Sequence, residues 1–136
     1  MNVAAASNQV LRTLVVDDNV DAATSLSELL QMLGCIPAVA FDGTMALQVA
    51  EGFQPALVFL DLEMPGPDGC EVVAQSRRSG NPLSRAYLVC LTARSSPADE
   101  ARCRAAGFDR FALKPLGTSA LREILLAARK RLRVAP

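Results

Sequence analysis

The chain has no histidine and no tryptophan, and only one tyrosine among its 136 residues. The absence of histidine excludes an imidazole general base and any zinc site that contains histidine. The four cysteines are widely spaced and form no CxxC pair, so we expect reduced thiols in a cytoplasmic protein. These cysteines are Cys35, Cys70, Cys90 and Cys103.

The sequence also has no excess of charge of one sign and no long apolar run. Fourteen basic and fourteen acidic side chains cancel, so bulk charge gives no reason to expect direct binding to nucleic acid. No apolar stretch approaches the roughly 20 residues that span a bilayer. The first residues lack the basic and apolar blocks of a signal peptide. We therefore expect no membrane insertion.

Short apolar runs alternate with segments of helical periodicity along the whole chain. This alternation predicts an α/β fold with five parallel strands joined by helices, although periodicity does not fix the strand order. We expect one domain over 12–132, with short tails at 1–11 and 133–136. The predicted strands cover 12–17, 35–40, 56–60, 85–91 and 108–113. The predicted helices cover 20–33, 44–51, 69–79 after a cap at Asp68, 97–107, and the segment capped by Thr118 or Ser119.

Charged residues stand at the ends of three of these strands. Asp17 and Asp18 follow the first apolar run, Asp61 follows the third, and Lys114 follows the fifth. Because the carboxyl ends of parallel strands share one edge of the sheet, three carboxylates and one ammonium are expected to meet there.

Carboxylates gathered in this way favour a hard cation, and a partly hydrated Mg²⁺ fits best. The lysine adds a positive charge that could hold a phosphoryl group. Asp61 stands alone at its strand end and is the candidate nucleophile for an aspartyl phosphate. Thr92, at the end of the fourth predicted strand, could donate its hydroxyl to a phosphoryl oxygen.

Four segments together resemble the receiver domain of response regulators in two-component signalling. They are Val15–Asn19, Leu60–Gly66 with Asp68 and Gly69, Leu91–Ala93, and Leu113–Pro115. The resemblance covers about residues 12–132 and is closest to receivers of hybrid histidine kinases. It implies a flavodoxin-like (βα)5 three-layer sandwich with a sheet of order 2-1-3-4-5.

The resemblance also implies roles for individual residues. Asp61 would take a phosphoryl group from a phosphohistidine, with Mg²⁺ held by Asp18, Asp61 and the backbone carbonyl of Glu63. Asp17 would act on the metal mostly through water. Lys114 would pair with the phosphoryl group, and the peptide bond between Lys114 and Pro115 would be cis.

Two further pairs of residues are implied near this site. Glu63 and Arg94, with Ala93 and Pro115, flank it, and we hypothesise an ion pair between Glu63 and Arg94 over the phosphoryl pocket. Two solvated side chains are the equally weighted alternative. Thr92 and Phe111 would form the switch that carries the signal to the surface, and the alternative for Phe111 is a core phenylalanine on the fifth strand.

Expected partners are a sensor histidine kinase or a histidine phosphotransfer protein, and an unknown downstream protein. Phosphorylation-dependent homodimerisation is possible, and the chain is either a single-domain protein or part of a longer one. Such a module would promote only its own phosphorylation and dephosphorylation. The alternatives are an intramolecular phosphate carrier from a hybrid kinase, a Mg²⁺-dependent aspartyl-phosphate phosphatase, a flavodoxin-like cofactor carrier and a constitutive adaptor. The phosphatase is disfavoured because Asp61-Leu62-Glu63 lacks the second aspartate that such enzymes use.

Overall fold

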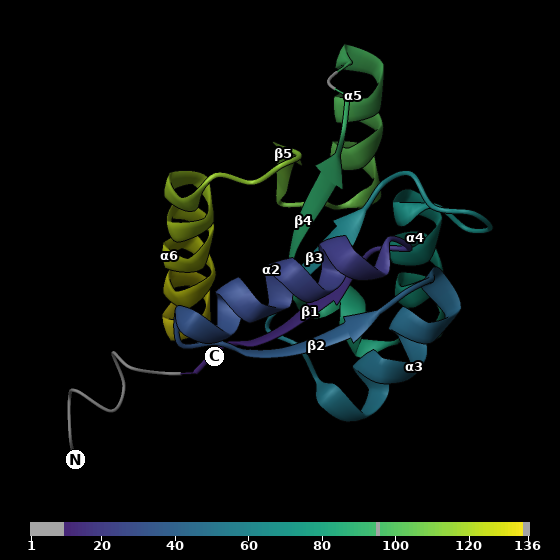
Figure 1. Cartoon of the computed structure of the whole chain (residues 1–136). Coiled ribbons are helices and arrows are strands. Elements are labelled where there is room, and N and C mark those ends of the chain that lie inside the picture. The colour runs from purple at the N-terminus through teal and green to yellow at the C-terminus, as the bar shows by residue number, and fades with distance from the viewer. Residues whose placement is uncertain (1–9, 95, 135–136) are drawn as a thin grey trace.

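Five parallel strands form the centre of the molecule in a computed structural model that describes residues 10–94 and 96–134. The sheet order is β2-β1-β3-β4-β5, which confirms the flavodoxin-like topology (Figure 1). Register along each pair is continuous, so the strands end at a common edge. The strands are β1 (Arg12–Val16), β2 (Ile36–Ala40), β3 (Leu57–Asp61), β4 (Tyr87–Thr92) and β5 (Arg110–Leu113).

Helices cover both faces of this sheet and create two apolar cores (Figure 1). One core lies under α2 and α6 and contains Phe59, which is fully buried. The other lies under α3, α4 and α5, and Val58 and Leu60 point into it. Both faces of the central strands are therefore buried, which explains their unbroken apolar sequence. The helices are α2 (Val20–Met32), α3 (Gly43–Phe53), α4 (Gly69–Ser79), α5 (Pro97–Ala106) and α6 (Thr118–Val134).

Side-chain caps start four of the helices where the sequence places a short polar residue. Asn19, Asp42, Asp68 and Ser96 each accept a hydrogen bond from a first-turn amide of the helix that follows. The predicted cap of the last helix at Thr118 or Ser119 is wrong. The carbonyl of Gly117 accepts the first helical hydrogen bond from Leu121, so Thr118 already lies inside α6.

Strands β2 and β3 begin one residue later than predicted, and β4 and β5 begin two residues later. Arg85 belongs to the 3₁₀-helix η1 (Pro82–Arg85), which the side chain of Asn81 caps, so β4 starts at Tyr87. The amide of Phe108 donates to the carbonyl of Cys103 and closes the end of α5, so β5 starts only at Arg110. Arg85 and Phe108 therefore lie outside the strands because their backbones belong to η1 and to the end of α5.

The domain boundaries also differ slightly from the prediction. Leu11, which we placed in the N-terminal tail, is fully buried, and α6 continues to Val134. Residues 1–9 and 135–136 of the predicted tails lie outside the described residues.

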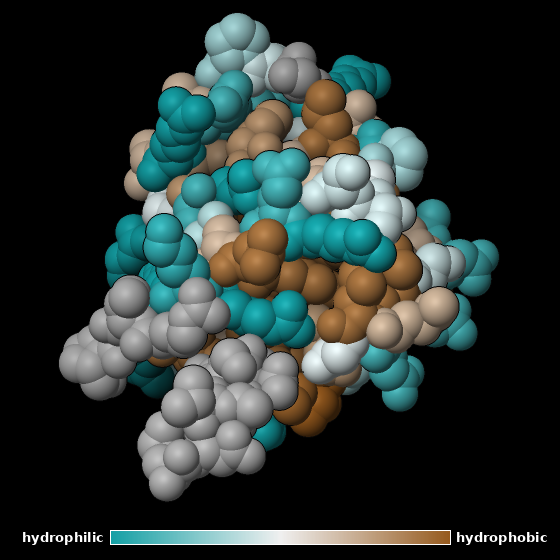
Figure 2. All heavy atoms as spheres, turned by 90° about the vertical axis from the view of Figure 1, so that its left-hand side faces the viewer, coloured by the Kyte–Doolittle hydropathy of each residue, from teal (hydrophilic) through white to brown (hydrophobic). Residues whose placement is uncertain are grey.

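The face of the molecule on the side of α6 carries both apolar patches and hydrophilic side chains (Figure 2). Seen from the side of α6, hydrophilic side chains separate the apolar patches from one another (Figure 2). Within residues 10–94 and 96–134, no helix is both long and apolar enough to cross a bilayer.

Candidate functional site

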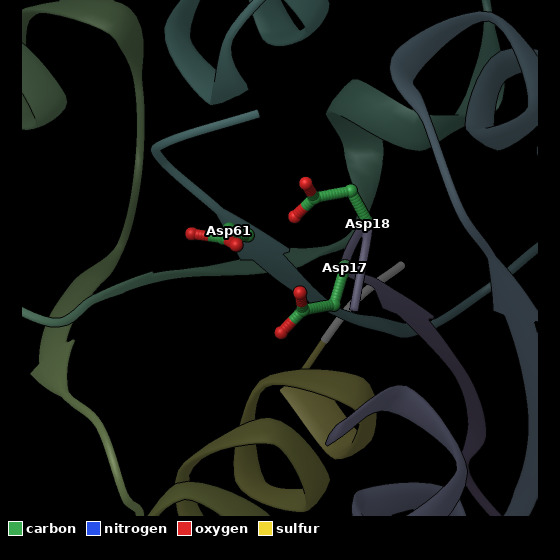
Figure 3. A group of neighbouring side chains, drawn as sticks. All are labelled: Asp17, Asp18 and Asp61. Atoms are coloured by element: carbon green, nitrogen blue, oxygen red, sulfur yellow. The ribbon is translucent and has the colours of Figure 1, made fainter. Parts of the chain in front are cut away.

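Three carboxylates converge at the carboxyl edge of the sheet. Asp61 is the last residue of β3, and Asp17 and Asp18 directly follow β1. One oxygen from each lies within 4.8 Å of the others (Figure 3). Asp17 and Asp61 are buried, whereas Asp18 is exposed. The structure thus brings together the acidic residues that the strand ends predicted.

The Lys114 ammonium links two of these carboxylates. Its Nζ donates to Asp17 Oδ2 at 2.7 Å and to Asp61 Oδ2 at 3.1 Å. Burial alone would lower the pKa of Lys114, but the hydrogen bonds to both aspartates outweigh it and raise the pKa. Lys114 is therefore a fixed cation among the carboxylates.

The pKa of the Asp61 carboxyl is raised, because burial outweighs the interactions that would lower it. Burial raises its pKa above the ordinary aspartate value, and this effect exceeds the opposing hydrogen bonds from Lys114 and from the Glu63 amide. The nearby charge of Asp17 raises the pKa further. The anionic form of Asp61 is thus less stabilised than that of an ordinary surface aspartate.

Local backbone turns orient the two buried carboxylates. The amide of Asn19 donates to Asp17 Oδ1 at 3.0 Å, and the amide of Glu63 donates to Asp61 Oδ1 at 3.1 Å. Each bond spans two residues, as in an Asx turn. One oxygen of each carboxylate is held by its own loop, and the other faces Lys114.

Glu63 and Arg94 do not form the hypothesised ion pair, although the structure describes both residues. Glu63 Oε1 instead accepts from the hydroxyl of Thr92 at 3.0 Å and from the amide of Ala93 at 3.4 Å. Arg94 contributes its amide, which donates to Thr92 Oγ1 at 3.2 Å. The carboxylate thus lies against the nearer donors at the end of β4.

The remaining predicted residues lie around this edge. The peptide bond between Lys114 and Pro115 is cis, as the resemblance implied. Thr92 is fully buried, and its carbonyl accepts from the Lys114 amide at 2.8 Å. Phe111 is half-buried and packs against the core under α3, α4 and α5. Its position fits a switch residue and a core residue equally well.

Gly69 lies against the backbone of Asp61, a contact that the sequence did not predict. A Cβ at this position would lie 2.9 Å from the Asp61 carbonyl oxygen. The N-terminus of α4 therefore packs directly against the backbone of the central aspartate. Gly69 follows Asp68 in a turn-rich segment, which indicated a loop but not this close approach.

The donor set fits a hard divalent cation. Asp17, Asp18 and Asp61 supply only oxygen atoms, and their clustering favours a bound positive charge in addition to Lys114. Softer metals would prefer thiolate or imidazole, and the chain has no histidine. All four cysteines are free and buried.

An apolar groove of about 300 Å³ opens beside the carboxylates. Its walls come from α2 and from the segment after β5, and Asp17 and Lys114 form part of its lining. The other lining residues are Ala22, Ser25, Leu26, Leu29, Leu91, Pro115 and Leu116.

Comparison with known proteins identifies this arrangement. The family model of the response regulator receiver domain matches residues 13–126. The chain belongs to this family. The chain is thus a receiver domain of the kind found in two-component systems.

The curated relatives of this receiver domain are longer than the chain. The transcriptional regulatory protein PrrA of Mycobacterium tuberculosis is 40% identical over 105 residues, which are 76% of this chain and 43% of PrrA. Hybrid signal transduction histidine kinase L of Dictyostelium discoideum is 33% identical over 119 residues, 84% of this chain and 7% of that kinase. The chain thus spans less than half of either relative. The chain is thus similar to proteins other than hybrid kinases, and its identity to PrrA (40%) is higher than its identity to the hybrid kinase (33%).

Solved structures show the same fold. The chemotaxis protein CheY4 of Vibrio cholerae superposes with a TM-score of 0.81 at 26% identity, covering 88% of this chain and 99% of CheY4. Nearly the whole of that protein therefore corresponds to this one receiver domain.

Proposed function

We propose that Asp61 accepts a phosphoryl group from a phosphohistidine on a sensor histidine kinase or a histidine phosphotransfer protein. The observation that carries this proposal is the buried Asp61 carboxylate, flanked by Lys114 at 3.1 Å and clustered with Asp17 and Asp18. An oxygen of Asp61 forms the new O–P bond as the N–P bond of the donor breaks. The leaving imidazole keeps the electron pair of the broken bond.

The residues around Asp61 have separate parts in this transfer. The Glu63 amide holds one oxygen of the aspartate, and Lys114 is placed to compensate charge on the phosphoryl oxygens. Asp18, Asp61 and the backbone carbonyl of Glu63 would hold Mg²⁺, with Asp17 acting mostly through water. Bound Mg²⁺ would supply the further positive charge that a phosphoryl group requires.

The apolar groove beside Asp17 and Lys114 supports a protein as the donor. A donor must bring its phosphohistidine up to Asp61, so its surface also covers the rim of the site. The groove offers this surface apolar contacts along α2. We therefore assign the groove to the histidine-bearing partner.

Phosphorylation would change the surface through Thr92 and Phe111. The phosphoryl group adds charge and acceptor oxygens, which would draw the Thr92 hydroxyl towards Asp61. Phe111 would then pack inward behind it. This change would alter binding to a downstream protein or to a second copy of the chain.

Incubation with acetyl phosphate and Mg²⁺ tests the proposal without a kinase. The expected result is a mass gain of one phosphoryl group that is stable in acid and labile in base, and no mass gain when Mg²⁺ is left out of the reaction. The D61N variant should show none. An unmodified wild-type protein, or an equal gain in D61N, would contradict the proposal.

A further inference from the structure

The hydroxyl of Thr92 forms a hydrogen bond with the side chain of Glu63 in this structure. It donates to Glu63 Oε1 at 3.0 Å and accepts from the Arg94 amide at 3.2 Å. A threonine hydroxyl has one proton, so it can donate only one full hydrogen bond at a time. Thr92 is fully buried, and water therefore does not replace a lost partner readily.

The position of Glu63 links this bond to the phosphoacceptor. Glu63 lies two residues after Asp61, and its amide donates to Asp61 Oδ1 at 3.1 Å. The same residue thus contacts the acceptor carboxylate through its backbone and the end of β4 through its side chain. Asp61 itself pairs with Leu91, the residue before Thr92.

We infer that Glu63 is a positioning residue that holds the Thr92 hydroxyl away from Asp61 and so opposes the phosphorylated conformation. This inference rests on the proposed role of Asp61 as phosphoacceptor. A phosphoryl oxygen on Asp61 and the carboxylate of Glu63 compete for the single Thr92 proton. Bonds to a charged acceptor are among the stronger protein hydrogen bonds, so Glu63 is an effective competitor.

Removing the Glu63 carboxylate should therefore strengthen binding of a phosphoryl analogue. The E63A variant frees the Thr92 hydroxyl and also removes a negative charge near Asp61. The E63Q variant removes the charge but keeps a carbonyl oxygen that can accept from Thr92. Comparison of these two variants separates the hydrogen bond from simple charge repulsion.

Beryllofluoride with Mg²⁺, titrated by amide NMR, is the probe of this competition. We expect E63A to bind it about three- to tenfold more tightly than wild type, and E63Q to show a smaller gain. Tenfold corresponds to about 1.4 kcal/mol. The T92V variant removes the hydroxyl, so E63A should change affinity less than about twofold in that background. T92S keeps the hydroxyl, so the full E63A gain should remain there.

The double-mutant cycle also shows how the inference fails. An E63A gain of equal size with and without the Thr92 hydroxyl would overturn it, because charge repulsion alone would then explain the effect. Unchanged or weaker binding in E63A would also overturn it. If T92V does not fold, the comparison of E63A with E63Q still decides, and equal gains in these two variants would overturn the inference. Wild-type protein that binds no beryllofluoride would instead contradict the proposed function.

Discussion

Lys114 lies closer to Asp17 than to Asp61: its Nζ is 2.7 Å from Asp17 Oδ2 and 3.1 Å from Asp61 Oδ2. One cation from the segment after β5 therefore joins carboxylates from β3 and from the loop after β1. Without Lys114, two buried negative charges would face each other. The lysine is thus a structural part of the site as well as a candidate ligand of the phosphoryl group.

The first prediction concerns the removal of this cation. K114M keeps much of the aliphatic chain but leaves Asp17 and Asp61 without their shared ion pair. Because Lys114 is partly exposed, we expect a loss of about 1–2 kcal/mol in the free energy of unfolding without Mg²⁺. Adding Mg²⁺ should restore part of this loss, because a bound cation stabilises the folded state.

Chemical denaturation with and without Mg²⁺ measures this effect. K130M is the matched control, because Lys130 is exposed on α6. An equal loss in K114M and K130M, or a loss in K114M that Mg²⁺ leaves unchanged, would show that Lys114 does not balance the acidic cluster.

The second prediction follows from the raised pKa of Asp61. Burial raises this pKa, so the folded state binds a proton more tightly than the unfolded state. The contribution of Asp61 to stability therefore falls as pH rises from the ordinary aspartate pKa through the raised folded value. Above that window the ionised side chain destabilises the fold.

The D61N variant should accordingly melt at a higher temperature than wild type at neutral pH without Mg²⁺. The difference should shrink as the pH falls below the ordinary aspartate pKa, where both side chains are neutral. Thermal unfolding across this pH range measures it. A difference that stays constant with pH would mean that the ionisation of Asp61 is not its cause.

The third prediction tests the contact between α4 and the phosphoacceptor. In G69A the new methyl group would lie 2.9 Å from the Asp61 carbonyl oxygen, so the backbone must move. We expect a loss of about 1–3 kcal/mol in stability and slower phosphorylation by acetyl phosphate. G52A is the control, since a Cβ at Gly52 in α3 meets open space. That change should stabilise the helix by up to about 1 kcal/mol. Wild-type stability and rate in G69A would contradict this account.

The fourth prediction separates partner docking from chemistry. Ser25 is exposed on α2 and lines the groove, whereas Thr24 is exposed on the same helix outside it. S25E should slow phosphotransfer from a phosphorylated histidine partner about tenfold, with little change in the reaction with acetyl phosphate. T24E adds the same charge and should leave both rates near wild type. Equal slowing by S25E and T24E would remove the groove from the donor interface.

Sequence reasoning predicted the convergence at the site because topology determines it. Once the strands are parallel, Asp61 and Lys114 must reach one edge, although they are 53 positions apart in the chain. The strand order came from family resemblance, because apolar periodicity carries no information on which strands are neighbours. Local capping by Asn81 and the end of α5 then shortened β4 and β5.

The partners of individual side chains were harder to predict. Glu63 binds Thr92 rather than Arg94, because the hydroxyl and the Ala93 amide are the donors that face it in the fold. Asp68, predicted as a helix cap, also pairs with Arg102 at 2.6 Å. Such choices depend on side-chain orientation and on distances between loops, which residue spacing does not encode.

The most direct test of the central claim locates the phosphoryl group on the chain. After reaction with acetyl phosphate and Mg²⁺, reduction with borohydride converts an aspartyl phosphate to homoserine, and peptide mass spectrometry identifies the altered residue. We predict homoserine at position 61 and nowhere else. Homoserine at Asp17 or Asp18, or an unaltered Asp61 in protein that has gained a phosphoryl group, would contradict the account.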